Sequence, residues 1–442
     1  MQRKRSVCFP EILTDIYLLL LCSVFILFTG PDGYTNLQSA KYQFFYTLSG
    51  GYLALLAILA IETRITGSAK KAPLPRLRPI HFLLLAYWLL TALSTLCSPY
   101  RSQAIVGISR NEGFFTISLY CATFLCVSLF ARPKPWLKWV LGGTMTVFGA
   151  ICVLQLLGKN PLHLYPAGLD YYDANLEYAG IYLGTTGNAG LTAALQTLTI
   201  PILLTAALRG KEKLRWLLLL PAVLNAAVLF KVQIQAGMLA LLVGLGLGLP
   251  VVLPLTKKRR CMAFALVGVV LLAGLAAVLL TDSTSGTVYE LREVLHGNFD
   301  SDFGNGRLYT WKEVLARIPE HLWLGTGPDT MAAAGITGYT WTPWGSTEAI
   351  PLVVDTAHND YLNILFHQGA PALAVYLAAL LWTAVGWIRK SAASPPAAAL
   401  GLGLLCYAIQ AFFSFSMCHA AALFWAGWAL LDNAINSLEV QS

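Results

Sequence analysis

Residues 257–282 read KKRRCMAFALVGVVLLAGLAAVLLTD, four basic residues followed by an apolar run that ends at a threonine and an aspartate. The run 263–280 contains no charged side chain, and about 20 mostly apolar residues suffice for a helix to cross a bilayer. Lysine and arginine are enriched on the cytoplasmic side of such helices. The stretch therefore predicts a transmembrane helix that begins in the cytoplasm and ends outside.

Eleven further apolar windows occur along the 442-residue chain, of which 57% is hydrophobic and only 12% is charged. Soluble globular proteins carry about a quarter charged residues, so this composition and a mean hydropathy of +0.62 exclude a purely soluble enzyme. We expect an all-α, polytopic membrane protein with about 12 transmembrane helices in a single integral membrane domain, residues 1–442. The twelve windows are 12–30, 44–61, 81–97, 114–131, 136–157, 188–208, 216–233, 237–255, 263–280, 361–387, 397–416 and 420–435.

The distribution of basic residues predicts a topology. If Arg3, Lys4 and Arg5 hold the N-terminus in the cytoplasm, alternate loops carry 21 of the 30 lysines and arginines, a positive-inside bias that sets orientation. Both termini are then cytoplasmic. The net charge of +8 follows from this topology and predicts no nucleic-acid partner. The nine cysteines form no C-x-x-C pair, so they predict neither a zinc site nor a disulfide framework.

The outward side contains three long segments, 98–113, 158–187 and 281–360. The last is a large extracytoplasmic loop between spans 9 and 10, where we expect any catalysis to occur. Apolar residues recur there at spacings of three and four over 307–322, which predicts an amphipathic helix. Such a helix would lie on the outer membrane surface with its apolar stripe down. The stripe consists of Leu308, Trp311, Leu315, Ile318 and Leu322.

Arg307 begins this helix, at a position where the helix dipole disfavours a cation. A guanidinium there can bind a diphosphate bidentately and stays charged in a partly dry site. The simpler interpretation is a solvated or headgroup-contacting arginine. Arg110 lies at an outer membrane boundary within Ser-Arg-Asn-Glu-Gly. It can reach a headgroup, or it can pair with Glu112 while its stem lies along apolar surface.

His358 directly precedes the window that begins near residue 361. A histidine at a helix N-terminus is kept neutral by the dipole and can accept a proton. This suits a general base, and an interface histidine fits the pattern equally well. Asn359 and Asp360 can cap the same helix or belong to a site. His367 can contribute to that site, or it can only bond to a neighbouring helix.

Metal and nucleotide chemistry are not expected. Asp300 and Asp302 have a spacing that can hold a divalent ion with a nucleotide diphosphate, but nucleotide sugars are not expected outside the cell. The chain also has no G-x-x-x-x-G-K-[ST] loop for nucleotide hydrolysis. We therefore expect no metal and no cofactor, and the energy must come with the substrate or from a gradient.

Three segments of the large loop, taken together, resemble the signature region of the O-antigen ligase and O-antigen polymerase superfamily. Two further segments are similar to other parts of the same superfamily, and the similarity covers most of residues 100–435. The signature segments are Gly306-Arg307-Leu308-Tyr309-Thr310-Trp311, Leu324-Gly325-Thr326-Gly327-Pro328-Asp329 and His358-Asn359-Asp360-Tyr361-Leu362, and the other two are Gly184-Thr185-Thr186-Gly187-Asn188 and Gln410-Ala411-Phe412-Phe413-Ser414-Phe415.

The resemblance implies a membrane fold of the glycosyltransferase C type, with a catalytic arginine and histidine on an outward loop. Arg307 would match the loop arginine and His358 the loop histidine. Arg110 resembles an arginine that precedes the fourth span in many relatives. Relatives often have Ser-Arg-Gly where this chain has Ile-Gln-Ala, so Gln235 replaces an arginine. Lys231, one helical turn earlier, is a candidate to bind phosphate in its place.

Members of this superfamily transfer a glycan from a polyprenyl diphosphate to an acceptor hydroxyl. The resemblance thus implies a metal-independent, inverting glycosyltransferase. Its partners would be an undecaprenyl diphosphate-linked donor, a glycan, lipid or protein acceptor, and membrane lipids. The enzyme would act in cell-surface polysaccharide biosynthesis, such as that of lipopolysaccharide, at the outer face of the bacterial cytoplasmic membrane. His367 stands where relatives frequently have a carboxylate, which leaves its role open.

Two other functions are compatible with the pattern. The main alternative is a membrane transporter of a small anion such as bicarbonate, because a relative of the superfamily has been linked to bicarbonate uptake. Few ionisable residues lie near the middles of the predicted spans, mainly Asp15 and His367, which argues against a coupled transporter. The other alternative is a non-catalytic membrane scaffold. Ligases and polymerases share the motifs, so the sequence does not distinguish between them.

Overall fold

The computed structural model describes residues 9–66, 76–132, 134–170, 183–336, 339–341 and 347–437. The helices are α1 (Phe9–Leu20), continued by a π-helical turn (Leu21–Phe25), a 3₁₀ turn (Gly33–Asn36), α2 (Leu37–Ile65), α3 (Pro79–Cys97), α4 (Arg101–Val106), α5 (Phe114–Phe130), α6 (Pro135–Leu156), α8 (Ala189–Arg209), a second 3₁₀ turn (Lys213–Leu218), α9 (Leu219–Val232), α10 (Gln235–Val252), α11 (Lys257–Leu279), α12 (Gly286–Leu295), α13 (Phe303–His321), α14 (Asp360–Gln368), α15 (Ala370–Lys390), α16 (Pro395–Ala411) and α17 (Cys418–Asn436). Strands β1 (Tyr339–Trp341) and β2 (Ile350–Leu352) pair antiparallel.

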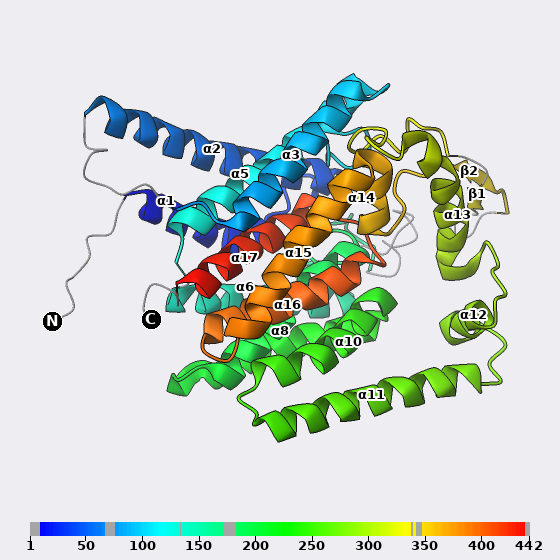
Figure 1. The fold of residues 1–442 in the computed structure, drawn as a ribbon. Coiled ribbons are helices and arrows are strands. Elements are labelled where there is room, and N and C mark those ends of the chain that lie inside the picture. Colours follow the sequence, from blue (N-terminus) through cyan, green and yellow to red (C-terminus); the bar gives the residue numbers. More distant parts are fainter. Residues whose placement is uncertain are drawn as a thin grey trace.

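Each of the twelve apolar windows overlaps a helix in the described part of the chain. Among the described residues, eight helices are long and apolar enough to cross a membrane, and α5 and α16 are shorter apolar helices. A polytopic membrane protein is therefore confirmed, whereas the number of 12 spans stays a prediction. Helix α11 has no buried residue and runs along the lower edge of the bundle in Figure 1, as expected for a helix surrounded by lipid.

Helices α8, α16 and α17 form the centre of the bundle and bury most of their residues. Small side chains bring α8 and α16 close together: a Cβ at Gly403 would lie 2.4 Å from the carbonyl oxygen of Leu198. Such close backbone approach is typical of helix packing in membranes. The side chain of Asn188 caps α8 by accepting hydrogen bonds from the N–H groups of Gly190 and Leu191.

The window 361–387, expected as one span, is divided into α14 and α15. Gly369 separates them with a φ of 86°, a conformation that residues with a Cβ rarely adopt. A Cβ at this position would also lie 2.4 Å from the carbonyl oxygen of Trp323. The N–H of Ala370 donates to the carbonyl of Leu322 at 2.7 Å. The chain that follows α13 therefore occupies the break, and only α15 has the length of a span.

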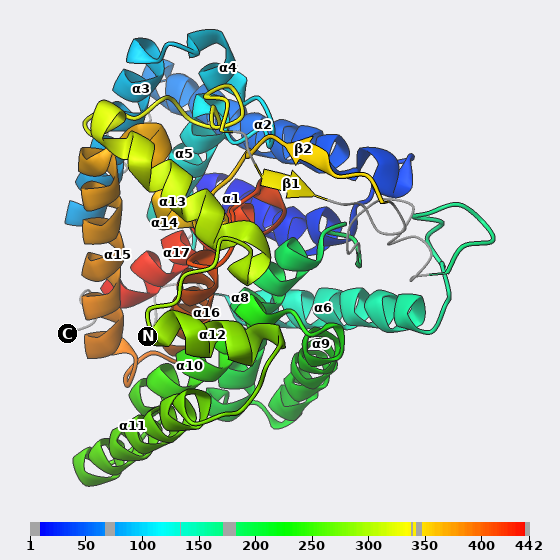
Figure 2. The same ribbon diagram turned by 90° about the vertical axis from the view of Figure 1, so that its right-hand side faces the viewer.

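The part of the molecule that carries α12, α13, the β1–β2 hairpin and α14 lies at one end of the bundle (Figure 1) and faces the viewer in Figure 2, and the start of α1 and the end of α17 lie toward the other end. The helix expected near 307–322 is α13. Its regular part begins only at Arg307, because Gly304, Asn305 and Gly306 have φ values of 66°, 58° and 74°. The all-α expectation is confirmed for the bundle, and the two three-residue strands are a local addition to it, since runs this short leave no clear period in the sequence.

The apolar stripe of α13 is divided between two environments. Of the stripe, Ile318 is buried in a small apolar cluster with Phe366 and with Val314, which lies beside the stripe, and Trp311 packs against this cluster. Leu315 is 54% exposed. Part of the stripe thus attaches α13 to α14. The position of this helix on the membrane surface stays a prediction, as does the catalytic role of segment 281–360.

Candidate active site

Helices α13 and α14 together hold the turn that contains His358. The indole N–H of Trp311 donates to the carbonyl oxygen of Ala357 at 2.7 Å, and the N–H of Ala357 donates to the side-chain oxygen of Asn363 at 2.8 Å. His358 has a φ of 48°, a left-handed conformation that costs about 1–3 kcal/mol in a residue other than glycine. Contacts from two helices therefore maintain a strained turn and determine where this imidazole lies.

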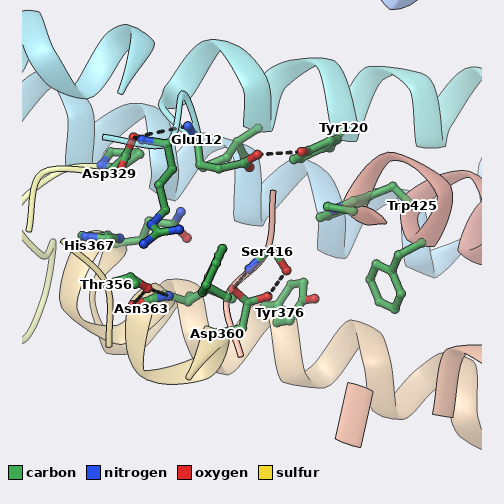
Figure 3. A pocket seen from close by; sticks show the side chains of 18 of the residues that line it. Glu112, Tyr120, Asp329, Thr356, Asp360, Asn363, His367, Tyr376, Ser416 and Trp425 are labelled. Atoms are coloured by element: carbon green, nitrogen blue, oxygen red, sulfur yellow. Dashed lines mark hydrogen bonds between the residues drawn. The ribbon is translucent and has the colours of Figure 1, made fainter. Parts of the chain in front are cut away.

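The two residues after His358 make structural contacts. The side-chain oxygen of Asn359 accepts a hydrogen bond from the N–H of Leu362 at 3.0 Å and caps α14. The carboxylate of Asp360 accepts hydrogen bonds from the N–H of Ser416 at 3.1 Å and from its hydroxyl (Figure 3). The start of α14 is thereby joined to the loop between α16 and α17.

Phe415, in that same loop, contacts both His358 and Arg110. The rings of Phe415 and His358 meet edge to face with their centroids 5.2 Å apart. The guanidinium carbon of Arg110 lies 3.8 Å from the centroid of the Phe415 ring, within the range of a cation–π contact. One apolar ring therefore brings a cation and an imidazole into the same site.

The guanidinium of Arg110 forms an ion pair with Asp355 at 2.9 Å. The pairing with Glu112 that we considered from the sequence is wrong, because Glu112 accepts a hydrogen bond from the hydroxyl of Tyr120 at 2.9 Å (Figure 3). Asn111, between the two, has a φ of 56°. This left-handed residue turns the chain, so that the side chains on either side of it have different partners.

Asp329 holds the loop that carries Arg110. One of its carboxylate oxygens accepts hydrogen bonds from the N–H groups of Arg110 at 2.8 Å, Ser109 at 3.3 Å and Glu112 at 3.4 Å (Figure 3). A carboxylate that binds several N–H groups makes stronger hydrogen bonds than a neutral acceptor. The backbone position of Arg110 thus depends on a residue from the end of the Leu-Gly-Thr-Gly-Pro-Asp motif.

Two glycines allow this motif to pass between α3 and α14. Gly327 has a φ of 102°, and a Cβ there would lie 2.6 Å from the hydroxyl oxygen of Ser98. A Cβ at Gly325 would lie 2.2 Å from the carbonyl carbon of His367. The N–H of Gly327 donates to the carbonyl oxygen of His367 at 2.8 Å. A larger residue at either glycine would displace the carboxylate at the end of the motif.

Arg307 brings a second positive charge to the site. Burial lowers the pKa of its guanidinium, which has no hydrogen-bond or ion-pair partner among the described residues. The pKa of His358 is lowered from 6.5 to about 4. Burial is the main cause, and the positive charges of Arg110 and Arg307 contribute to the same shift. The negative charge of Asp355 opposes it. Both arginines and the imidazole therefore interact electrostatically, and the imidazole is neutral at neutral pH.

A cavity of about 90 Å³ adjoins Arg110 and Asp355, whereas neither Arg307 nor His358 lines it. Within the described part of the chain, Nε2 of His367 and Oε1 of Gln368 are buried without a hydrogen-bond partner. Both residues line the cavity, although these two atoms themselves have almost no accessible surface. Other polar residues that line it are Glu112, Asp329, Thr356, Asp360, Asn363 and Ser416 (Figure 3).

Lys231 and Gln235 do not lie with Arg110 and His358 in the candidate site. Both side chains are exposed, and neither lines the cavity. Gln235, at the start of α10, donates to the hydroxyl of Thr287 at the start of α12. No contact in the described residues ties Lys231 to either arginine. The hypothesis that Lys231 binds phosphate in place of the arginine that relatives have at the position of Gln235 therefore has no structural support.

Three residues of the site escaped the sequence analysis. Asp329 and Phe415 belong to segments that carry the family resemblance, and that signal could have identified them. Asp355 stands in a stretch without a recognisable pattern, and only its ion pair with Arg110 reveals it. For a metal, the described residues contain no group of three or more His, Cys, Asp or Glu side chains that could hold an ion.

Comparison with known proteins adds one family match. Residues 220–377 match the family model of O-antigen ligase. A search of the curated proteins found no match. The matched region runs from α9 into α15 and includes Arg307, His358 and His367, whereas Arg110 and Phe415 lie outside it. Eight described helices are long and apolar enough to cross a membrane, so the chain is a multi-pass membrane protein, and its residues 220–377 are similar to the O-antigen ligase family.

Proposed function

We propose that this protein transfers an oligo- or polysaccharide from an undecaprenyl diphosphate carrier to an acceptor hydroxyl at the outer face of the bacterial cytoplasmic membrane. The observation that carries the proposal is the contact of both Arg110 and a neutral His358 with the Phe415 ring at one end of a membrane bundle, where the charge of Arg307 also acts on the imidazole. Guanidinium groups suit the oxygens of a diphosphate. A neutral imidazole suits the proton of an attacking hydroxyl.

In the proposed reaction the acceptor oxygen attacks the anomeric carbon from the side opposite to the diphosphate. The bond between that carbon and the diphosphate oxygen breaks, and its electron pair leaves with the diphosphate. The anomeric carbon is inverted. His358 takes the acceptor proton, while Arg307 and Arg110 stabilise the negative charge that develops on the leaving group. The carrier bond supplies the energy, so this scheme uses no metal or cofactor.

Electrostatics would couple donor binding to the strength of the base. In the free site burial and the two arginines lower the pKa of His358, which makes it a weak base. A bound diphosphate would bring negative charge close to both guanidiniums and oppose their effect, because a nearby anion favours the protonated imidazole. His358 would therefore become an effective base once the donor is in place.

The proposed orientation is supported by basic residues at the end of the bundle where α1 begins and α17 ends. The predicted cytoplasmic loops, which include Arg78, Lys134 and Arg209, lie toward that end, as the positive-inside rule requires. At the site end, Leu315 and Trp323 are 54% and 72% exposed. Exposed apolar side chains at this end would suit contact with the outer surface of the bilayer.

Transport of a small anion has weaker support. Asp15, one of the two ionisable residues considered for it, binds Lys134. Glu11 binds the same lysine at 3.0 Å. A carboxylate that is already neutralised by a neighbouring ammonium offers no free charge to couple transport. Glycan transfer in purified protein, measured beside anion flux in liposomes, separates the two functions.

The test uses the full-length protein, reconstituted with a lipid-linked donor. His358→Ala should abolish transfer while the donor still binds, since a general base contributes about 10²–10⁴-fold. Arg307→Lys should weaken donor binding, because the bidentate fork is lost. His296→Ala, at an exposed residue directly after α12, is the matched control and should retain activity. Full activity of His358→Ala would refute the mechanism.

Offering lipid A core or a second carrier-linked chain as acceptor separates ligase from polymerase.

A further inference from the structure

A second and larger cavity lies toward the opposite end of the bundle, between α1, α6, α8, α16 and α17. Its volume is about 380 Å³, many times the roughly 10–15 Å³ that a single water needs. The hydroxyl of Thr199 donates to the carbonyl of Leu195 in its own helix at 2.8 Å. The wall thus offers water few partners, and apolar cavities do not hold water well. The wall includes Leu18, Leu141, Leu198, Ile202, Leu423 and Leu430.

The charged residues of this cavity come from one level of the bundle, the start of α6 and the end of α8 with the loop after it. They are Lys134, Lys138, Arg209, Lys211 and Glu212. The cavity therefore has an apolar interior and a charged rim at the level where α6 begins and α8 ends. This arrangement matches an amphipathic ligand with an apolar tail and a polar head.

Two of the four cations on the rim are neutralised by carboxylates. Lys138 pairs with Glu212 at 2.7 Å. Lys134 pairs with Asp15 and with Glu11. In these pairs the positive charge of each lysine is balanced by a carboxylate of the protein. They therefore give the rim no preference for the charge of a ligand.

The other two cations on the rim have no carboxylate partner. Arg209 donates to the backbone carbonyls of Ala392, at 2.8 Å, and of Val252, which leaves its positive charge in place. Lys211 is exposed and has no partner among the described residues. The rim therefore carries two uncompensated positive charges, which favour an anionic head.

Helix α17 leaves space on the cavity side. Gly427 lines the cavity, and a Cβ there would meet a single atom, the Cδ2 of Leu404, at 3.9 Å. A larger side chain at this position would enter the cavity without displacing backbone. Gly427 is therefore the position from which the cavity can be filled by substitution.

We propose that this cavity binds an anionic phospholipid, with an acyl chain between the apolar walls and the phosphate near Arg209 and Lys211. Basic pockets between transmembrane helices on the cytoplasmic side of a membrane bind anionic headgroups. A zwitterionic phospholipid has the same acyl chains but no net charge to match the rim. The site is built from residues other than those of the proposed active site, so lipid binding does not depend on the transfer reaction.

Native mass spectrometry of the full-length protein in neutral detergent, titrated with dioleoylphosphatidylglycerol or dioleoylphosphatidylcholine, tests this. Wild-type protein should bind the anionic lipid about fivefold more tightly or better. Lys211→Glu should weaken that binding about fivefold or more and leave phosphatidylcholine binding unchanged. Gly427→Leu should weaken binding of both lipids. Gly143→Leu, on an exposed face of α6 where a Cβ meets nothing within 4 Å, is the matched control.

Equal affinity for the two lipids, or wild-type affinity of Lys211→Glu for the anionic lipid, would overturn the proposal. So would wild-type lipid binding by a folded Gly427→Leu protein. If Gly427→Leu does not fold, Lys211→Glu decides the outcome alone, because the Lys211 side chain is exposed and has no contact to lose. Phosphatidylglycerol binding that inorganic phosphate displaces completely would identify a phosphate site without an acyl-chain pocket and would also overturn it.

Discussion

At the scale of single residues, the protonation of His358 is the property on which the proposed reaction depends most. Burial is the main cause of its lowered pKa, the charges of Arg110 and Arg307 add to it, and Asp355 opposes them. The residue is held in a left-handed turn with its ring against Phe415. An imidazole in such surroundings is a poor base until negative charge arrives. This behaviour suits a site whose substrate is an anion.

The pH profile should report this environment. Because the reaction needs a neutral imidazole and the pKa of His358 is about 4, kcat/KM should fall only as the pH approaches 4, well below the 6.5 of an ordinary histidine. Arg307→Gln removes one cation, so this pKa should rise and the acid limb should move to higher pH. Profiles of both proteins check this. If the acid limb of the kcat/KM profile lies at the same pH in Arg307→Gln as in the wild type, the charge of Arg307 does not act on His358.

The same shift affects stability in a defined direction. The unfolded chain binds the His358 proton with a pKa near 6.5, whereas the folded site binds it only near 4. The unfolded state therefore holds more protons between these values, and stability should decrease as the pH falls from 6.5 toward 4. Thermal unfolding of wild-type and His358→Gln protein across this range measures it, since the variant should lose part of the dependence. An identical dependence in both would contradict this prediction.

Asp329 is expected to act on the donor through Arg110. In Asp329→Ala the three N–H groups of the loop lose a charged acceptor, and such hydrogen bonds contribute about 1.5–3 kcal/mol each. The loop should move, and donor affinity should decrease about tenfold or more. Donor binding to purified protein is the measurement, with Asp300→Ala, at an exposed position, as control. Unchanged donor affinity would contradict a positioning role.

At the scale of elements, the site depends on two short pieces of chain that support each other. Helix α14 has nine residues, and a helix this short is marginal on its own. It packs on α13 through the apolar cluster that contains Val314, Ile318 and Phe366. The glycine break at Gly369 separates α14 from the span-length helix α15, which leaves α14 free to pack against α13.

Trp311→Phe tests this dependence. The substitution removes the hydrogen bond from the indole to the carbonyl of Ala357 and keeps an aromatic ring. A hydrogen bond contributes about 0.5–1.5 kcal/mol net, so kcat should decrease about two- to tenfold while donor affinity is retained, because His358 loses its fixed position. Trp323→Phe, at a 72% exposed residue, is the control. A variant with unchanged kcat would argue against this role of α13.

At the scale of the whole molecule, stability at the end opposite the site rests on a buried ion pair. Asp432 in α17 binds Arg78, which precedes α3, and accepts a hydrogen bond from Ser128 in α5 at 2.6 Å. Asp432 is 5% exposed. Three helices from distant parts of the sequence are thereby joined on the side away from the proposed chemistry.

Asp432→Ala should therefore reduce stability without a direct effect on catalysis. Removing one partner of a buried ion pair leaves an uncompensated charge and costs about 3–5 kcal/mol. We expect a lower Tm in detergent and an unchanged specific activity for the protein that remains folded. Glu62→Ala, at an exposed residue near the end of α2, should leave the Tm unchanged. A wild-type Tm in Asp432→Ala would contradict this prediction.

The sequence by itself determined the membrane class, the places of the helices and the approximate span of α13, and it named Arg307 and His358 as candidates for the site. These properties depend on local runs and motifs: an apolar stretch must form a helix in lipid because no water is present to satisfy its backbone. The short hairpin and the division of the window 361–387 were not predicted. The break at Gly369 depends on a carbonyl of Trp323 that only the folded chain brings near.

Only the tertiary structure decided which groups meet in the site. Arg110 pairs with Asp355 instead of its neighbour Glu112, and its ring partner Phe415 comes from the far end of the chain. Lys231, expected beside the phosphates, makes no contact with either arginine in the described residues. Ion pairs and ring contacts act over a few ångströms, so they are set by how distant segments pack, and no spacing along the chain encodes that distance.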